Sequence, residues 1–452
     1  MAILKKISLN NFRVFKDKTD FELAPITILT GANNSGKSSV LKALLLWESN
    51  CDFDKINTLV FKDGRHDLGE FGLAKSGTND TMDFEFTYTG IPLEDDFFAN
   101  DAEYTVALSY TRNNGSGKLK SFQFFYTDVL IFSVEYEELN HKTSTNIFVD
   151  FMYLFKNDIM KNISNINMPY HYSIKDIFGI TITKFQEWLK DKSGITKNST
   201  YYSNLYYHKI DSVYYIQNHL RAAFQHLFHL DYTSANRSRA QRAYTKAIAP
   251  YTYDTFAVYT KKDLNYDDAK VREFVHFWMT DKKGFGLVED LDIFMENETI
   301  FVRIKHNGGM RGNLTEVGFS VAQILPLVVR IAINDTQFAL VEEPETNLHP
   351  KLQARLADMF MEAYTQFGTR FIVETHSEYF IRKLQWHTAK GNIKPEDTAV
   401  YYLYDPNDAR PADEPQVKRL RIDENGDFDM PFGTGFFDEA TNLMLNIYRA
   451  KT

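Results

Sequence analysis

The hydrophobic and polar positions of this chain follow different periods in different parts of its 452 residues. Apolar and polar residues alternate over 3–30 and again, with many aromatic side chains, over 82–138, which predicts three strands and then an antiparallel β-meander. Between about 145 and 230 the spacing becomes helical, which predicts an inserted helical lobe. From about 320, apolar strands and helices take turns, a pattern typical of a parallel α/β sheet.

The composition is that of an ordinary soluble protein, with 44% hydrophobic and 25% charged residues. The net charge of −9 indicates that the chain as a whole does not attract nucleic acid, although it leaves room for local basic patches. The first residues lead into a strand pattern without the apolar stretch of a signal peptide, and no apolar run approaches the ~20 residues that span a bilayer. With Cys51 as the single cysteine, we expect a cytoplasmic protein without a membrane partner.

The most informative segment is a glycine-rich loop of the pattern G-x4-G-K-[ST], formed by Gly31, Gly36, Lys37 and Ser38. Such glycines let the backbone curl around an anion, the lysine reaches the terminal phosphates, and the hydroxyl can bind magnesium. An apolar, β-branched run precedes the loop, and apolar residues at helical spacing follow it as far as Trp47. Because strand, loop and helix are the context that the motif requires, the sequence predicts a nucleotide-binding protein.

A second motif is an apolar strand that ends in the carboxylates Glu342 and Glu343. Magnesium-dependent phosphoryl transfer needs one acid at a strand tip for the hydrated metal and a second acid that polarises the attacking water. We therefore assign Glu342 to the metal and Glu343 to the general base. A strand that runs into a solvated acidic turn would also explain the pattern, but the phosphate loop in the same chain favours the catalytic interpretation.

A third motif is an apolar strand that leads to His376, with a helix expected to begin near Ser377. The strand tips of a parallel sheet are where ligands bind, and a histidine there can hydrogen-bond a γ-phosphate or orient water. A lone histidine at a strand end is more often structural, so the functional interpretation depends on the other two motifs.

Together the three motifs resemble the ABC-class ATPase heads of the RecF, SMC and OLD group. The resemblance covers about 1–75 and 230–452, and its phosphate loop has the form Asn33-Asn34-Ser35-Gly36-Lys37-Ser38-Ser39. Within the group the chain is most similar to bacterial ATPases with a C-terminal segment like Gly435-Phe436-Phe437-Asp438-Glu439 and an arginine-rich segment like that at 237–244. Many of those ATPases are components of anti-phage defence systems.

The resemblance implies an α/β fold, an ABC-type P-loop NTPase head with an antiparallel β lobe and an inserted helical lobe. We expect the head to consist of two parts, 1–75 with the phosphate loop and 231–452 with the signature, Walker B and switch histidine motifs. Between them we expect a β-meander lobe at 76–144 and the mainly helical lobe at 145–230.

The resemblance also implies the ligands ATP and Mg²⁺ and a role for each matched residue. Lys37 would hold the β- and γ-phosphates, and Ser38 and Glu342 would hold the magnesium ion. Glu343 would activate the water, and His376 would be the switch histidine. The further nucleotide-binding positions that it implies are Arg13, Asn33, Asn34, Ser35, Gly36 and Ser39.

ABC heads usually work as pairs, in which the helix N-terminus of one signature motif caps the γ-phosphate in the other subunit. The matching segment 317–323 keeps Gly318, Ser320 and Gln323 but departs from the usual Leu-Ser-Gly-Gly-Gln. Ser320 is therefore the candidate for a contact in trans, and Leu348-His349-Pro350 would line the interface. We expect at least a homodimer.

OLD nucleases carry a metal-dependent Toprim domain after the head. Here the short segment after His376 contains Asp427 and Asp429 in a glycine-flanked turn rather than after an apolar strand, so we expect no nuclease site. The first hypothesis is therefore an ATP-driven switch that senses a trigger and controls a separate effector, either a nuclease or a toxin.

The second hypothesis is a RecF-like, DNA-binding ATPase in repair or maintenance. In that case Arg237, Arg239, Arg242 and Lys246 would line a groove that contacts phosphates. The alternative is that these arginines bind acidic neighbours or nucleotide within the head, which the net charge favours. The degenerate signature and the aromatic-rich segment inserted between the two parts of the head argue against a third hypothesis, that the chain is the ATPase of a membrane transporter.

Overall fold

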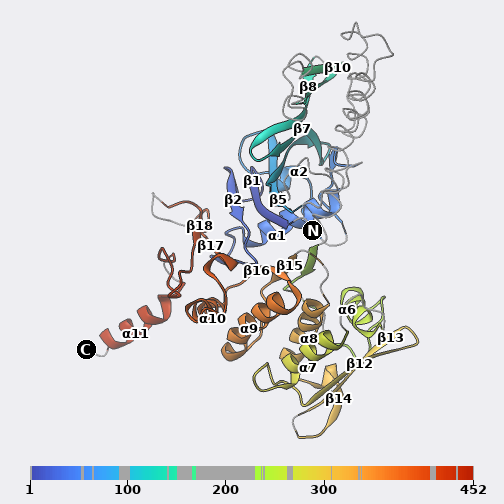
Figure 1. Cartoon of the computed structure of the whole chain (residues 1–452), viewed down its shortest axis with the longest axis vertical. Coiled ribbons are helices and arrows are strands. Elements are labelled where there is room, and N and C mark those ends of the chain that lie inside the picture. The colour runs from blue at the N-terminus through green and yellow to red at the C-terminus, as the bar shows by residue number, and fades with distance from the viewer. Residues whose placement is uncertain are drawn as a thin grey trace, which may run out of the picture. The chain divides into compact units, whose positions relative to one another are not determined.

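The chain forms two compact units in the computed structural model, and Figure 1 labels their elements. The first unit contains Met1–Leu23 and Ser39–His229, and the second contains Ala24–Ser38 and Leu230–Thr452. The predicted segment 1–75 is therefore divided between the two units. The structure describes residues 3–51, 55–63, 66–90, 102–139, 142–149, 165–168, 230–235, 237, 240–261, 268–306, 308–333, 336, 338–407, 414–433 and 436–450.

The first unit contains an antiparallel sheet of nine strands. Its elements are β1 (Ile3–Asn10), β2 (Thr19–Glu22), β4 (Thr58–Leu59), α2 (Phe71–Ala74), β5 (Thr81–Thr89), β6 (Tyr104–Asn113), β7 (Ser116–Tyr126), β8 (Val129–Leu139), β9 (Lys142–Val149) and β10 (Asn165–Met168). The strand order is β10-β9-β8-β7-β6-β5-β1-β2, and β4 pairs with β7. Side chains are buried at every second position of β5 and over most of β6. The alternating pattern in the sequence thus corresponds to one buried and one more exposed face of these strands.

Helix α1 (Lys37–Asn50) begins in the second unit and continues in the first. Its Trp47 ring stacks on Phe86 of β5, with ring centroids 4.8 Å apart. Near its end, the Asn50 amide both accepts from and donates to the backbone of Val60. An apolar contact and a pair of hydrogen bonds thus attach this helix to the first unit.

The predicted helical lobe at 145–230 lies mostly outside the described residues, including the helical spacing at Phe185, Trp188 and Ile216. Its described parts, 145–149, 165–168 and 230, are all in strands. The prediction of helices there stays a prediction.

The second unit contains a six-stranded sheet in the order β11-β15-β16-β3-β17-β18. These strands are β11 (Leu230–Thr233), β15 (Phe338–Glu342), β16 (Arg370–Glu374), β3 (Ile26–Gly31), β17 (Thr398–Leu403) and β18 (Val417–Leu420). All neighbours are parallel except β17 and β18. Strands β3 and β17 are buried at every position, as expected for a parallel sheet covered on both faces. The predicted α/β class is confirmed.

Helices and a small sheet complete the second unit. The helices are α6 (Pro250–Thr260), α7 (Asp268–Thr280), α8 (Phe319–Ala332), α9 (Pro350–Phe367), α10 (Glu378–Ala389) and α11 (Glu439–Arg449), with short 3₁₀ turns at Leu314–Glu316 and Pro395–Asp397. The small antiparallel sheet consists of β12 (Asp290–Glu296), β13 (Thr299–Lys305) and β14 (Arg311–Asn313). Among the helices of the described residues, none combines the length and the apolar content needed to cross a bilayer.

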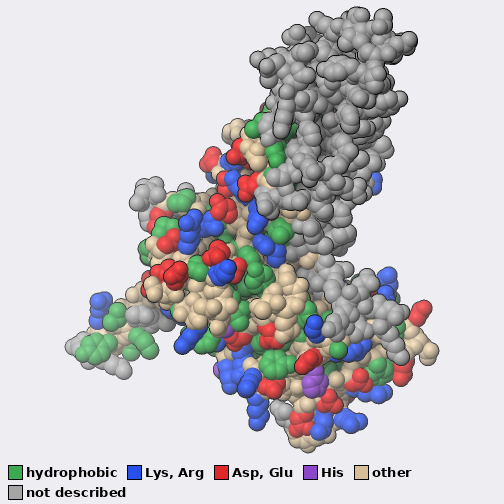
Figure 2. All heavy atoms as spheres, in the orientation of Figure 1, with side chains coloured by type: hydrophobic (Ala, Val, Ile, Leu, Met, Phe, Trp, Pro, Cys, Tyr) green, Lys and Arg blue, Asp and Glu red, His purple; other side chains and the backbone are tan. Residues whose placement is uncertain are grey.

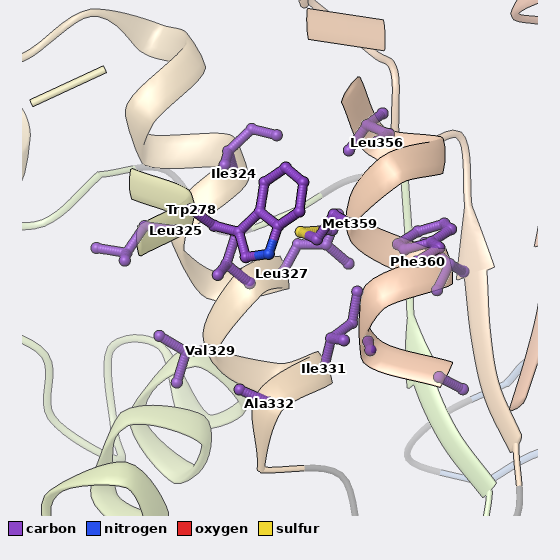
Figure 3. Packing of buried hydrophobic residues seen from close by; sticks show 14 of the residues in the cluster. Trp278, Ile324, Leu325, Leu327, Val329, Ile331, Ala332, Leu356, Met359 and Phe360 are labelled. Carbon is purple, nitrogen blue, oxygen red and sulfur yellow. The ribbon is translucent and has the colours of Figure 1, made fainter. Parts of the chain in front are cut away.

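The core of the second unit is centred on large apolar side chains from α7, α8 and α9. Figure 3 shows the indole of Trp278, from α7, between Ile324 and Leu327 of α8 and Met359 of α9. On the sheet side of α9, the Phe360 ring stacks on a phenylalanine of β16 at 4.6 Å. This packing fixes α8 and α9 against the sheet that carries the site described below.

A buried ion pair joins the edge strand of this sheet to α8. The Asp231 carboxylate, on β11, accepts a hydrogen bond from Arg330 Nε, and the Asp231 side chain is only 3% exposed. Arg330 also lies over the Tyr251 ring, 5.3 Å from its centroid. These contacts of Arg330 therefore connect β11, α8 and α6.

Replacing Asp231 by Ala is expected to lower the free energy of unfolding by about 2 to 3 kcal/mol, because it leaves the Arg330 guanidinium largely buried without its carboxylate. Urea unfolding measures the loss. The matched control is Asp290→Ala, in which a carboxylate with a 60% exposed side chain is removed and a change within about 0.5 kcal/mol is expected. Equal effects of the two substitutions would show that the buried pair has no special stabilising role.

An aromatic cluster attaches the C-terminal segment to this unit. Phe432 lies 5.1 Å from Phe436 and 4.5 Å from Phe437, and its ring also contacts Tyr402 of β17. A Cβ atom added to Gly433 would lie 2.3 Å from the Tyr402 ring, so only glycine fits there. Of the Gly-Phe-Phe-Asp-Glu segment, the two phenylalanines thus serve packing, whereas its glycine lies outside the described residues. Helix α11 follows (Figure 1). Its residues 442–449 are exposed.

Candidate functional site

The glycine-rich loop connects β3 to α1 at the carboxyl edge of the six-stranded sheet. Gly31 and Gly36 have φ values of 127° and 104°, which L side chains rarely adopt. A Cβ atom on Gly31 would also lie 2.1 Å from the carbonyl oxygen of Leu403, so the close approach of β17 requires a glycine. The motif glycines therefore allow the backbone to curve sharply just before α1 begins at Lys37. The backbone N–H groups at the N-terminus of a helix favour an anion.

Lys37 lies inside the curl, with 4% of its surface exposed. Its Nζ donates to the carbonyl oxygens of Ala32 at 2.6 Å and Gly31 at 3.2 Å. Burial lowers the pKa of Lys37, while the charge of Glu374 acts in the opposite direction. The carbonyl groups of the loop thus hold the ammonium group of Lys37 at the loop, where it can contact a bound anion.

Two carboxylates end neighbouring strands beside the loop. Glu342 is the last residue of β15, Glu374 is the last residue of β16, and the two are paired in register. The Ser38 hydroxyl donates to Glu374 Oε1 at 2.8 Å, across 336 positions of sequence. The fold thus joins the loop serine directly to the strand tips.

Glu374 is 5% exposed, and burial raises its pKa to about 7, against the opposing effects of the Ser38 hydroxyl and the Lys37 charge. Its Oε2 is buried and has no hydrogen-bond partner within the part of the chain that the structure describes. Sequence reasoning assigned no role to Glu374. A usable signal was present, because it ends an apolar strand in the same way as Glu342.

These oxygen atoms fit a magnesium ion. A hard cation prefers carboxylate and hydroxyl oxygens, and the unpartnered Glu374 Oε2 lies on the same carboxylate that accepts from Ser38. Ser38 and Glu342 would hold the ion, with Glu374 beside them. Within the described ranges, no three His, Cys, Asp or Glu side chains form a metal site of their own. In phosphoryl-transfer sites the nucleotide phosphates supply further ligands.

Glu343, the predicted general base, occupies the turn that follows β15. Its φ of 41° is left-handed, and its backbone N–H donates to the carbonyl oxygen of Glu374 at 2.8 Å. Its side-chain Oε2 accepts from the Thr346 hydroxyl at 3.1 Å. The turn is therefore joined to β16 through the backbone of Glu343 and to Thr346 through the Glu343 carboxylate.

His376 follows β16, two residues beyond Glu374. Its backbone N–H donates to Glu345 Oε1 at 2.6 Å, and Glu345 is 8% exposed. Partial burial and the nearby Lys37 charge lower the pKa of His376 below its usual range, so the imidazole is neutral at pH 7. Ser377 then caps α10, as its hydroxyl accepts from the backbone N–H of Phe380.

The structure brings most of the predicted site residues to one edge of one sheet. Asn33 and Asn34 are exposed on the loop, whereas Ser35 is fully buried. Ser39 is the first residue of the part of α1 that belongs to the first unit.

Arg13 and Ser320, which were also predicted for the site, come from other segments of the chain. Arg13 belongs to the first unit, where its backbone N–H donates to Ala74 and burial lowers the pKa of its guanidinium. Ser320 lies in the first turn of α8, and its hydroxyl donates to the carbonyl oxygen of Asn347 at 3.3 Å. Asn347 follows the Glu343 turn, so the signature segment touches the same loop.

The remaining candidate residues differ in their surroundings. Asp423 and Asp429 accept hydrogen bonds from backbone N–H groups, and Asp427 lies in the same turn. In the arginine-rich segment, Arg237 is buried, Arg242 is exposed, and Arg239 lies outside the described residues.

Two protein-family models match parts of this chain. A model of the AAA ATPase domain family matches residues 1–381, and a model described as a protein of unknown function (DUF3696) matches residues 393–447. A search of curated proteins found no significant match.

Among solved structures, the chain is similar to the SMC head domain from Thermotoga maritima, with 14% identity over 84% of this chain and 92% of that chain and a TM-score of 0.37. It is also similar to the Smc head domain with an extended coiled coil, bound to the C-terminal domain of ScpA, from Pyrococcus furiosus. That match has 12% identity over 99% of this chain and 100% of that chain, with a TM-score of 0.40. Such low TM-scores transfer no function to this chain.

Proposed function

This chain belongs to the AAA ATPase domain family, and from that premise we propose that it is an ATP-hydrolysing switch that controls a separate effector protein in a bacterial anti-phage defence system. The observation that carries the proposal is the convergence of the phosphate loop and the strand-tip carboxylates, through the contact of Ser38 with Glu374. A loop for phosphates and acids for metal and water, held on one sheet edge, are the parts that phosphoryl transfer to water needs.

In this proposal each residue acts through the geometry described above. Lys37 exchanges its bonds to Ala32 and Gly31 for bonds to the β- and γ-phosphates. Ser38 and Glu342 would hold a magnesium ion, which would supply positive charge to neutralise the phosphates.

The water-activating groups follow from the same edge of the sheet. Glu343 accepts a proton from the attacking water, since its carboxylate is half-buried and accepts a hydrogen bond from the Thr346 hydroxyl. His376, as a neutral imidazole, hydrogen-bonds the γ-phosphate or orients the water.

The switch in this proposal is assembly. Ser320 lies at the N-terminus of an α-helix of 14 residues, where unpaired N–H groups favour an anion. We place there the γ-phosphate of ATP bound to a second copy of the chain. The contact of Ser320 with Asn347 would couple this binding to the turn that carries Glu343. The nucleotide contacts of Arg13 and Ser39 stay predictions, because both residues belong to the first unit.

The defence role is tested by phage challenge of a host that expresses the chain together with the products of its neighbouring genes. We expect reduced plaque formation with the natural sequence and none of that protection with Lys37→Ala. The matched control is Lys394→Ala, which removes a lysine with a 76% exposed side chain. Equal plaque numbers with and without the natural sequence would overturn the defence role and leave the ATPase proposal to be judged separately.

The alternative is a DNA-binding ATPase of repair or maintenance. Arg237 does not favour it, because its guanidinium already binds backbone carbonyls. On the face shown in Figure 2, basic and acidic side chains are interspersed, which gives no extended field of one sign there. Salt-dependent binding of duplex DNA that is lost in Arg242→Ala would nevertheless favour this alternative over the switch.

A further inference from the structure

Arg237 lies beside the turn that carries Glu343. It follows β11, which pairs in parallel with β15, so both chains leave the sheet at the same edge. Arg237 Nη2 donates to the carbonyl oxygen of Glu343 at 2.8 Å and to that of Glu342 at 3.3 Å. Its Nη1 lies 3.5 Å from the carbonyl oxygen of Pro344. One guanidinium thus faces three consecutive carbonyl groups.

These carbonyls belong to a turn that the sheet does not support on that side. Pro344 has no N–H group, and β15 ends at Glu342. On the other side, the N–H of Glu343 donates to the carbonyl oxygen of Glu374 in β16. The backbone of Glu343 is therefore held from two directions, by β16 through its N–H and by Arg237 through its carbonyl.

This double hold matters because Glu343 has a φ of 41°. The left-handed region is uncommon for residues other than glycine and costs free energy that the surrounding structure has to offset. Released from either hold, the residue would relax toward a negative φ, and its carboxylate would swing with the backbone.

The chemistry of the side chain fits this use. Arg237 is 6% exposed, and none of the ion pairs among the described residues includes it. Burial lowers the pKa of Arg237 to about 10, while Glu345 opposes the fall, so the group stays charged at neutral pH. A planar guanidinium offers donors in a fixed fork that can serve several carbonyls at once, which an ammonium group does not reproduce.

We propose that Arg237 is a positioning residue for ATP hydrolysis, which fixes the backbone of Glu343 so that its carboxylate meets the attacking water. The inference rests on the proposed ATPase function. It assigns the arginine to the turnover step and not to nucleotide binding, because its two terminal nitrogens, Nη1 and Nη2, face the carbonyls of the turn. It also gives this arginine a role other than contacting DNA.

Single-turnover hydrolysis and equilibrium binding of ATP separate these steps. Arg237→Met is expected to lower the hydrolysis rate about 10²-fold, the effect of a misplacement near 1 Å, while the dissociation constant for ATP stays within a factor of about three. Arg237→Lys keeps the charge and the apolar stem and is expected to lose less activity. The control Arg303→Met changes an exposed arginine of the same unit, which lies over the Phe294 ring, and is expected to behave like the natural protein.

A double-mutant comparison distinguishes positioning from general stabilisation. If Arg237 acts through Glu343, then Arg237→Lys lowers the rate in the natural background but not further in a Glu343→Gln background. Equal losses in both backgrounds, an unchanged rate in Arg237→Met and Arg237→Lys, or parallel losses of ATP affinity and melting temperature in both variants would each overturn the inference. A natural protein that fails to hydrolyse ATP would instead overturn the proposed function on which it rests.

Discussion

Replacing Glu343 by Gln is expected to leave ATP binding unchanged and to lower the turnover rate by about 10²- to 10⁴-fold, the usual contribution of a positioned general base. The amide keeps the size of the side chain and can still accept from the Thr346 hydroxyl, so the turn should hold its shape. The carbonyl and N–H of residue 343 keep their bonds to Arg237 and Glu374, because those bonds involve only the backbone. The substitution therefore removes a proton acceptor and little else.

Phosphate release under saturating ATP measures the turnover, and a fluorescent ATP analogue measures the affinity. Light scattering with ATP should show oligomers that persist longer than those of the natural protein, since the bound nucleotide is no longer consumed. Glu396→Gln, at a side chain that is 70% exposed, is the control for losing one carboxylate. Undiminished turnover in Glu343→Gln would remove Glu343 from the base role and would point to Glu345 or Glu374 instead.

The parts of the site that sequence predicts well are those encoded by short, local patterns. Gly31 and Gly36 identify the loop because both have positive φ values, which glycine adopts most readily. The two positions are close in sequence, so the pattern can be recognised locally. The mainly apolar runs of β3 and β15 identify buried strands for the same local reason. The strand-tip positions of Glu342 and His376 follow directly from where those runs end.

The rest depends on which strands become neighbours, which no local pattern contains. Strand β3 inserts between β16 and β17, so Ser38 meets Glu374 although 336 positions separate them. The same placement puts the phosphate loop of the predicted segment 1–75 in the second unit, together with residues 230–452. Arg237 is the clearest case, because an arginine in a basic segment fits DNA, nucleotide or protein equally well until its carbonyl partners are known.

Replacing Lys37 by Ala is expected to abolish detectable ATP binding, and turnover with it. The ammonium group supplies charge-assisted hydrogen bonds to phosphate, each contributing about 1.5 to 3 kcal/mol, so losing two of them weakens binding by at least about 10²-fold. In the natural protein those donors are held at the loop by the carbonyls of Ala32 and Gly31, so little rearrangement is needed when the phosphates arrive. Isothermal titration with ATP and magnesium measures the loss.

Because Lys37 is buried, its removal also leaves the carbonyls of Ala32 and Gly31 without a donor, so the variant must be shown to be folded. Lys37→Met fills most of the same volume and provides that comparison, with the same expected loss of binding. Binding that survives in both variants would contradict the loop assignment itself.

The contrast with Glu343→Gln then separates two kinds of switch. If protection from phage survives Glu343→Gln but not Lys37→Ala, ATP binding alone sets the active state. If both substitutions abolish it, the chain must complete hydrolysis to act on its effector.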